Sequence, residues 1–189
     1  MKGYNVMKVI NIKSVGEWKD AYSAAMTTCK GTKKKDPNDS WKKKMLLAEH
    51  SVIRTLSVSW VWVGIPYWVS VHFTRHNIGI THFVTSQRTD ITGINREKLT
   101  QNELVNHECL ANYQALLNIS RKRLCGKASK ETTNTWRAFL GHLRKEIDPI
   151  LADVCVPECI YRGFCPERMS CGYAGKFLFS QNLKNYREF

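Results

Sequence analysis

The chain has 189 residues, which is long enough for one domain with a sizeable buried core. Its formal net charge of +13 favours an anionic partner, such as a nucleotide, a nucleic acid or an acidic surface. The longest apolar run, residues 58–71, is interrupted by serine, glycine and proline and is too short to span a bilayer, so we expect no membrane association.

Cysteine usage bears on the cellular compartment. The first residues lack the long apolar core of a secretory signal. Without such a signal, the seven cysteines favour reduced thiols or metal ligands over disulfides. We therefore expect a cytoplasmic location.

The N-terminal part is predicted to contain a strand at residues 4–11 and an amphipathic helix at residues 15–29. Seven lysines follow between Lys30 and Lys44, on both sides of a Pro-Asn-Asp turn. This segment is either a solvated loop that aids solubility or a basic lip that attracts phosphate. Residues 45–49 are predicted to be helical.

The central stretch, residues 50–90, predicts a strand, a helix and a polar loop. Apolar side chains alternate over residues 55–63, with Leu56, Val58, Trp60 and Trp62 on one side, which is typical of a strand. Pro66 fits the first turn of a helix, where its missing N–H costs nothing. We expect this strand and helix to bring the polar side chains of the following loop to one spot: Arg75, His76, Asn77, Ser86, Gln87 and Arg88.

The C-terminal half is predicted to be mainly helical. A turn-rich loop covers residues 89–101, and leucines repeating near seven predict a helix over residues 102–124. A second helix is predicted over residues 132–147, with Ser129 or Thr132 as its N-cap. We expect one domain over residues 1–173 and a polar, basic tail over residues 174–189.

Four cysteines lie close together near the C-terminus, at spacings of four, six and six: Cys155, Cys159, Cys165 and Cys171. Four thiolates can hold a zinc ion or an iron–sulfur cluster. The spacings differ from the Cys-x-x-Cys pairs of standard zinc knuckles, so reduced, partly buried cysteines remain the alternative.

The residues alone indicate an anion-binding site built from His and Arg. The sequence has no glycine-rich phosphate loop, no Gly-x-Ser-x-Gly turn and no His-Glu-x-x-His helix. Arg88, Arg121 and Arg144 are candidates for binding a phosphate. Ser86, Gln87 and His72 could bind the carbonyls of a pyrimidine.

The central stretch resembles the flavin-dependent thymidylate synthases. Residues 75–77, Arg-His-Asn, resemble the family's Arg-His-Arg, and residues 86–88, Ser-Gln-Arg, resemble its Ser-x-Arg, one residue later than the family spacing. His50 matches the family's histidine before the strand, and His72 stands where the family usually has glutamine.

Matches continue downstream, so the resemblance covers roughly residues 45–160. Ser120-Arg121 is similar to the family's Ala-Arg, and residues 132–134 with Arg137 are similar to its Thr-x-Asn-x-Arg with one residue inserted. Short phage-borne members share the Thr-Ser-Gln-Arg-Thr-Asp segment and the Cys-Pro-Glu segment, which suggests a phage-infected or bacterial host cell.

The resemblance implies an α/β (α+β) domain with a central antiparallel or mixed sheet and flanking helices. It implies a homotetramer that binds flavin and deoxyuridylate where subunits meet. Reduced FAD, recharged by NADPH, would help to move a one-carbon unit from methylenetetrahydrofolate to C5 of dUMP.

The resemblance also implies roles for individual residues. Those expected to bind the flavin are His50, Arg75, His76, Asn77, Asn134 and Arg137. Those expected to bind the nucleotide are His72, Ser86, Gln87, Arg88 and Arg121. Ser86, Arg88 and Arg144 are the expected catalytic residues.

The sequence departs from the family in three places. Asn77 replaces the second arginine of the signature, residues 80–84 lack the family's Asn-Glu pair, and the four-cysteine segment is additional. Three alternatives therefore stay open. They are a related enzyme with another product, such as a pyrimidine hydroxymethylase, a basic nucleic-acid-binding protein with a metal-bound tail, and a degenerate member with a structural role.

Overall fold

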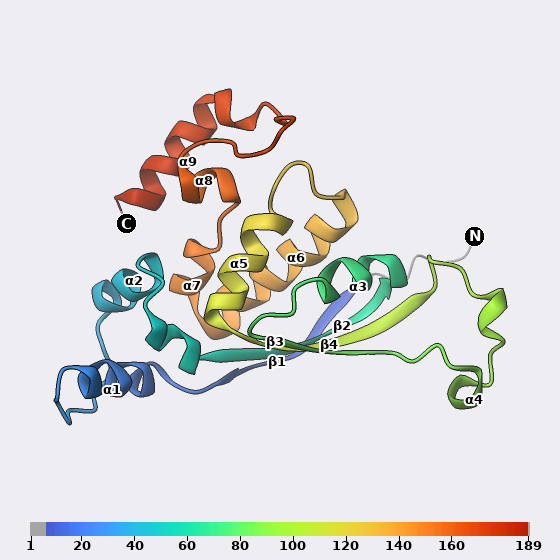
Figure 1. The fold of residues 1–189 in the computed structure, drawn as a ribbon, viewed down its shortest axis with the longest axis horizontal. Helices are drawn as coiled ribbons and strands as arrows, with labels where there is room; N and C mark the ends of the chain where they lie inside the picture. Colours follow the sequence, from blue (N-terminus) through green and yellow to red (C-terminus); the bar gives the residue numbers. More distant parts are fainter. Residues whose placement is uncertain (1–6, 189) are drawn as a thin grey trace.

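A single antiparallel sheet organises the chain, and the computed structural model describes it within residues 7–188. The strands are β1 (Lys8–Val15), β2 (Ser57–Pro66), β3 (Ile80–Val84) and β4 (Leu104–Asn112), in the spatial order β1-β2-β4-β3. Every neighbouring pair is antiparallel. The expected sheet with flanking helices is thus confirmed (Figure 1).

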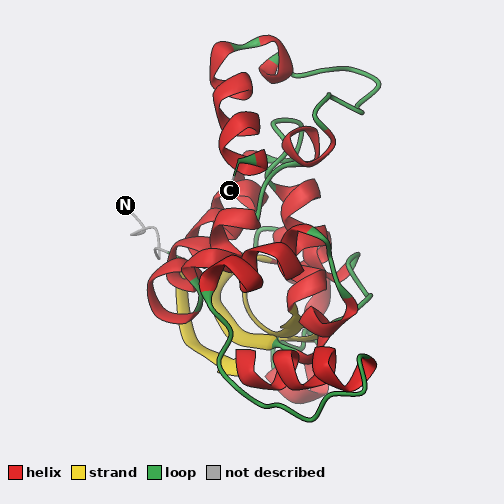
Figure 2. Ribbon diagram, turned by 90° about the vertical axis from the view of Figure 1, so that its left-hand side faces the viewer, coloured by secondary structure: helices red, strands yellow, loops and turns green. Residues whose placement is uncertain are grey.

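Helices cover one face of this sheet (Figure 1). In chain order the helical segments are α1 (Trp18–Thr28), α2 (Asp39–Leu47), η1 (Ser51–Thr55), α3 (Tyr67–Thr74), α4 (Thr89–Thr92), η2 (Arg96–Lys98), α5 (Tyr113–Arg123), α6 (Lys130–His142), η3 (Leu143–Ile147), α7 (Pro149–Val154), α8 (Glu158–Arg162), η4 (Tyr173–Gly175) and α9 (Phe177–Arg187). Figure 2 shows the curved sheet beneath the helices, with the C-terminal helices extending away from it. In residues 7–188, no helix is both long and apolar enough to cross a membrane.

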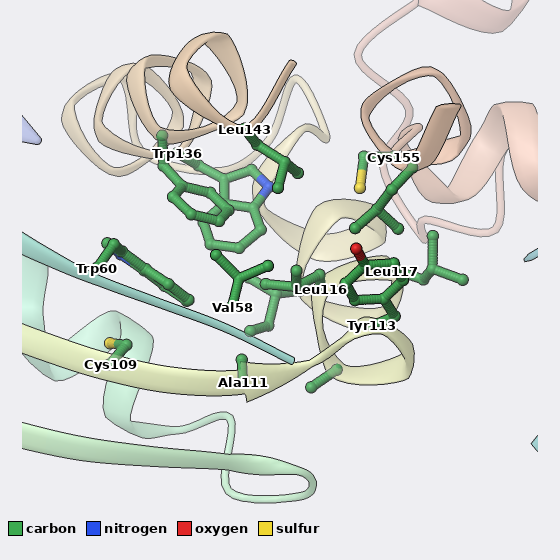
Figure 3. Packing of buried hydrophobic residues seen from close by; sticks show 14 of the residues in the cluster. Val58, Trp60, Cys109, Ala111, Tyr113, Leu116, Leu117, Trp136, Leu143 and Cys155 are labelled. Carbon is green, nitrogen blue, oxygen red and sulfur yellow. The ribbon is translucent and has the colours of Figure 1, made fainter. Parts of the chain in front are cut away.

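The core lies between β2, β4 and the helices above them. Leu56, Val58, Trp60 and Trp62 are all buried, as their alternation predicted. Trp60 lies 4.1 Å, centroid to centroid, from the ring of Phe139 on α6 (Figure 3 shows the neighbouring core). Aromatic packing of this kind stabilises by about 0.5–1.5 kcal/mol per pair beyond the area buried.

One predicted helix is partly wrong, because residues 104–112 form strand β4 and only residues 113–123 are helical. Buried and exposed residues alternate along β4, with Val105, His107, Cys109 and Ala111 buried. The leucine repeat suggested a helix, but Leu104 and Leu110 are exposed on the opposite face of the strand. Asn112 ends the strand and caps α5, where its Oδ1 accepts a hydrogen bond from the Ala115 N–H at 2.9 Å.

Other boundaries follow the sequence closely. The first strand spans Lys8–Val15, and residues 4–6 of its predicted range lie outside the described residues. The second predicted C-terminal helix is α6, which continues through the π-helical turn η3 as far as Ile147. Ser129 is its N-cap, with Oγ accepting from the Thr132 N–H at 3.3 Å.

The C-terminal residues are more ordered than expected. Residues 177–187 form helix α9, which packs against α8. Together with the loop between them, these two helices extend beyond α5 and α7 (Figure 1). The domain boundary at residue 173 stays a prediction.

Candidate active site

A polar groove runs along the start of β3, where the Arg-His-Asn segment leaves helix α3. Three adjoining cavities of ≈ 170, ≈ 440 and ≈ 330 Å³ form it. The first two cavities share Ile78 and Asn118, and the last two share Gly79 and Asn112. The full lining also includes Glu49, Arg54, Ser57, Arg75, His76, Asn77, Ile80, Thr81, Leu110, Gln114, Ala115 and Ile119.

His76 is held in a defined protonation state at one end of this groove. Its Nε2 accepts a hydrogen bond from the Arg123 Nε–H at 3.0 Å, and Arg123 also donates to the His72 carbonyl. A guanidinium can only donate, so Nε2 carries no proton. Burial and the nearby Arg123 charge lower the pKa of His76 to about 4. His76 is therefore neutral near pH 7, with its proton on Nδ1.

Arg123 is a half-buried cation without an acidic partner. Among the described residues, no carboxylate forms an ion pair with it, and Arg75 lies near enough to lower its pKa further after burial. Neither Arg75 nor Arg123 has an acidic partner among the described residues, so the two guanidinium groups create a positive potential beside His76. This end of the groove is suited to an anion with several oxygens, such as a phosphate.

Two hydrogen-bonded histidines, His82 and His107, fix the backbone of the Arg-His-Asn segment at His76. The His82 Nε2–H donates to the His76 carbonyl at 2.7 Å, and its Nδ1 lies 2.9 Å from His107 Nε2. Since His82 Nε2 must donate to a carbonyl, its Nδ1 accepts the proton of His107. The Cys109 thiol lies 3.5 Å from the same nitrogen.

Burial keeps His107 and Cys109 uncharged near pH 7. It lowers the pKa of His107 to about 4, with His82 as a second cause, and it raises the pKa of Cys109 far above its usual range. His82 and His107 were missed in the sequence. The alternation on β4 could have placed His107 and Cys109 on one buried face, beside the strand that carries His82.

His72 connects helix α3 to the start of α6. Its Nδ1 lies 2.9 Å from Thr132 Oγ1, and that hydroxyl also accepts a hydrogen bond from Ser129 Oγ at 2.7 Å. The structure thus brings together two positions that the family resemblance matched separately. Burial and the charges of Arg123 and Arg75 lower the pKa of His72.

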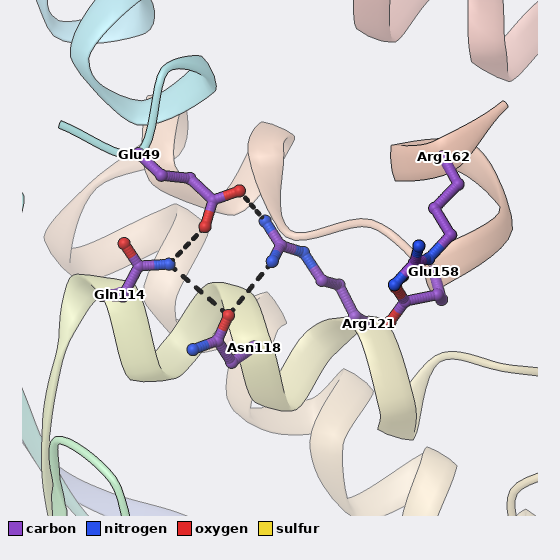
Figure 4. A network of polar contacts seen from close by, with 6 residues as sticks. All are labelled: Glu49, Gln114, Asn118, Arg121, Glu158 and Arg162. Carbon is purple, nitrogen blue, oxygen red and sulfur yellow. Dashed lines mark hydrogen bonds and ion pairs between the residues drawn. The ribbon is translucent and has the colours of Figure 1, made fainter.

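A second polar network lies beside the groove and includes Arg121 (Figure 4). Arg121 forms an ion pair with Glu49, donates to Asn118 Oδ1 at 3.1 Å, and stacks 3.5 Å from the centre of the Tyr161 ring. Gln114 donates to Glu49 at 2.5 Å. Glu49 therefore neutralises the guanidinium that was predicted to bind the nucleotide, and that role of Arg121 stays a prediction.

The second half of the signature lies at the other end of β3. Five strand residues alone separate the two halves by roughly 17 Å at about 3.3 Å per residue. Arg88 makes a two-point contact with Asp90 at 3.1 and 2.6 Å, and the Ser86 hydroxyl accepts the Arg88 N–H at 3.2 Å. The expectation that these residues meet Arg75 at one spot is wrong within one chain, because β3 lies between them.

The remaining predicted residues are scattered. His50 caps η1 with its Nδ1, which accepts from the Val52 N–H at 3.4 Å. Arg144 pairs with Asp153 at 2.6 Å, and Asn134 is exposed on α6. Arg137 lines a separate cavity beside Cys159 and not the groove. The structure does not bring these four residues to Arg75.

The predicted set of four cysteines is not grouped as expected. Cys155 is buried in the core near Tyr113 and Leu117 (Figure 3). Cys159, Cys165 and Cys171 line one cavity with Cys125, which sequence reasoning had left out. Cys155 directly follows α7 and is buried in the core. Cys159 lies within α8, and Cys165 and Cys171 lie in the loop after it.

The antiparallel sheet with helices on one face is similar in fold to the flavin-dependent thymidylate synthases, as the family resemblance implied. Thymidylate synthase X from Helicobacter pylori, in a structure with FAD and dUMP, superposes with a TM-score of 0.65 at 14% identity, over 78% of this chain and 99% of that chain. The UMP/dUMP methylase PolB from Streptomyces cacaoi, bound with 5-Br dUMP, gives 0.63 at 12% identity, over 84% and 95%. No family model and no curated protein sequence matches the chain.

Proposed function

We propose that this protein is a flavin-dependent enzyme that transfers a one-carbon unit from methylenetetrahydrofolate to C5 of dUMP, with NADPH as the reductant. The observation that carries the proposal is the unneutralised pair Arg75 and Arg123 beside a neutral His76, in a chain with this fold. The proposal rests on the chemistry of the groove as much as on the fold.

The groove residues fit the phosphates of FAD. Arg123 is half-buried, has no acidic partner among the described residues, and is anchored by two hydrogen bonds that leave part of its guanidinium free. Arg75 is exposed beside it, and Asn77 supplies an amide where the family has the second arginine of its Arg-His-Arg signature. When bound, FAD would supply the hydride chemistry that the side chains lack.

Ser86, Gln87 and Arg88 are the residues that we expect to bind dUMP, from a neighbouring subunit. Gln87 Nε2 is buried and has no hydrogen-bond partner among the described residues, so a donor is available for a pyrimidine carbonyl. Arg88 is exposed, and within residues 7–188 its guanidinium is paired with Asp90 alone, so a phosphate could replace that carboxylate. Positive charge near the ring carbonyls favours the charge that develops when C5 is attacked.

The uncovered face of the sheet supports assembly into a homotetramer with shared sites. Phe83, Leu110 and Ile10 are 60%, 40% and 41% exposed on that face, and strand pairing places Ile10 and Phe83 in one row across the sheet. Exposed apolar groups of this kind commonly mark protein interfaces. An assembly through this face would also allow Arg88 of one chain to approach Arg75 of another.

A cytoplasmic location in a bacterial or phage-infected cell fits the proposal. All seven cysteines are free thiols in the structure. Free thiols persist where the compartment is reducing.

An absorbance spectrum of the freshly purified protein is the first test. Bound FAD that bleaches with NADPH, and dUMP turnover with methylenetetrahydrofolate, are the expected results. Mass analysis of the product separates methylation from hydroxymethylation. A protein that neither carries nor takes up FAD, and whose melting temperature dUMP does not raise, would refute the proposal, since a ligand at a hundred times its dissociation constant adds about 2.7 kcal/mol of stability.

A further inference from the structure

Four thiols converge on one cavity of ≈ 480 Å³ outside the proposed active site. Cys125 lies just after α5, Cys159 lies within α8, and Cys165 and Cys171 lie in the loop between α8 and α9. None of the four is in a disulfide. Three separate segments thus deliver a soft metal ligand to the same place.

Contacts around the cavity bring these segments close together. Cys171 Sγ lies 3.0 Å from the point that a Cβ on Gly126 would occupy, so the loop touches the turn that carries Cys125. The Lys127 N–H donates to Cys125 Sγ at 3.5 Å. Cys125 and Cys165 both lie close enough to Cys159 to interact with its thiol electrostatically.

The loop between α8 and α9 has little else to hold it. Residues 163–172 contain no helix or strand, and the large side chains Phe164 and Met169 are 57% and 72% exposed. A segment that buries so little apolar surface gains little stability from packing. A metal bound through Cys165 and Cys171 would fix both ends of this loop.

The charged side chains that line the cavity are Arg137, Glu158 and Glu167. Four thiolates around a zinc ion or a cubic iron–sulfur cluster leave a net negative charge. Arg137 is exposed, lines the cavity and has no ion-pair partner among the described residues. It could therefore pair with a negatively charged metal centre instead of making the predicted flavin contact. Glu158 also lines the cavity but is paired with Arg162 at 2.5 Å and with Lys122 at 3.4 Å.

The spacing of the sulfurs favours a centre larger than one ion. Tetrahedral zinc with Zn–S bonds of about 2.3 Å places its sulfurs roughly 3.8 Å apart. Among the described residues, the one group of three or more such ligand atoms within 4.8 Å of one another is His82, His107 and Cys109. No three of the four sulfurs are therefore as close as a zinc ion requires.

We propose that Cys125, Cys159, Cys165 and Cys171 ligate an iron–sulfur cluster that fastens α8 and α9 to the end of α5. The proposal assigns Cys125, and not the core residue Cys155, as the fourth ligand. It is independent of the proposed one-carbon transfer, because the groove at Arg75 has its own residues.

Metal analysis of the full-length protein, purified without oxygen, tests this assignment. We expect stoichiometric iron and sulfide in the wild-type protein, and a fall to below about a tenth of that content in Cys125→Ser and Cys171→Ser. Cys29→Ser removes an exposed thiol outside the cavity and should keep the full content, as should Cys155→Ala.

Several results would overturn the proposal. They are a metal-free wild-type protein, full metal content in Cys125→Ser, or equal loss in Cys29→Ser. Loss in Cys155→Ala together with retention in Cys125→Ser would restore the ligand set suggested by the sequence. Zinc without sulfide would support the four ligands and overturn the cluster.

Alkylation of the native wild-type protein tests the proposal without any substitution. The four cavity thiols should resist alkylation until a chelator removes the metal, whereas exposed Cys29 should react at once. Rapid alkylation of Cys171, which is also exposed, before chelation would count against bound metal.

Discussion

At the scale of single residues, Arg123 gives the groove its character. Its guanidinium fixes the unprotonated nitrogen of His76 and holds the carbonyl of His72, yet no described carboxylate neutralises it. A half-buried charge of this kind is unfavourable on its own and becomes favourable when an anion binds. Arg123 thus connects the end of α5 to His76 and His72, and we expect it to contact the phosphates of FAD as well.

Arg123→Ala should weaken FAD binding by at least about tenfold, because one charge-assisted contact to a phosphate typically contributes about 1.5–3 kcal/mol. Arg123→Lys should recover only part of the affinity, because lysine cannot make the two directed contacts. Titration of FAD fluorescence measures both. Arg144→Ala, which removes an exposed partner of Asp153, is the matched control. Unchanged FAD affinity in Arg123→Ala would exclude this arginine from the flavin site.

His107 should make the fold sensitive to mild acid. Its pKa is about 4 in the folded chain against an ordinary value of 6.5, so the unfolded chain binds the additional proton below pH 6.5. Stability should therefore be unaffected above pH 7 and fall as the pH drops toward 4. His107 should contribute about 2 kcal/mol to the loss between pH 7 and pH 5, and His76, whose pKa is also about 4, should add to it.

Urea unfolding at pH 7 and pH 5 measures this loss, and the interval stays above most of the titration of the carboxylates. His107→Asn removes one of the two titrating groups and should reduce the loss between pH 7 and pH 5 by about 2 kcal/mol, although it lowers stability at both values. An equally steep dependence in His107→Asn would assign the effect to other groups, such as half-buried His76.

Some of these residue roles were predictable and others were not. The signature pointed to Arg75 and His76, and both line the groove, while their roles in binding stay predictions. Arg123 was not, because a basic turn of Arg-Lys-Arg gives no sign of which side chain points inward. The ion pair of Arg121 with Glu49 was equally hidden, because 72 positions separate them.

At the scale of elements, the contact between the turn at Gly79 and the start of α5 determines the shape of the groove. Gly79 has φ of +74°, and a Cβ there would lie 2.7 Å from the side-chain Nδ2 of Asn112. Asn112 is the residue that ends β4 and caps α5. The turn before β3 and the start of the helix must therefore fit against each other.

Gly79→Ala should lower the free energy of unfolding by about 2–4 kcal/mol, because it adds a steric clash to the strain of a positive φ. Gly64→Ala is the matched control, since Gly64 has φ of +73° with no atom within 4 Å of the added Cβ. Gly64→Ala should lower the free energy of unfolding by only about 1 kcal/mol. Denaturant unfolding measures both variants. Equal costs for the two variants would show that the contact with Asn112 can relax.

The secondary structure was predictable where one periodicity dominates. β2 and α6 have clean patterns and were found, with errors of a few residues at their ends. Residues 102–112 carry two patterns at once, a leucine repeat of seven and a strand alternation, and the strand wins because it pairs with β2 and β3. Pairing of that kind is a tertiary effect, which a local pattern does not contain.

At the scale of the whole molecule, the division of the signature by β3 predicts that two defective chains can repair each other. Arg75→Ala and Arg88→Ala should each be inactive alone. If a site takes Arg75 from one subunit and Arg88 from another, mixed assemblies should regain about a quarter of the wild-type activity.

Co-refolding or co-expression of the two variants, followed by the dUMP assay, measures this recovery. A double variant, Arg75→Ala with Arg88→Ala, mixed with wild-type protein is the control, and it should give no recovery beyond the wild-type chains present. No recovery in the mixture of single variants would mean that the sites are not shared between chains.

The segment between β3 and β4 also has a consequence for the lifetime of the chain in the cell. Residues 85–103 extend away from the sheet, and Ile91 and Ile94 on them are 62% and 52% exposed (Figure 1). Extended, exposed segments are the preferred points of proteolytic cleavage. We expect a chain that has not assembled to be cut there first, which would remove unassembled chains from the cell.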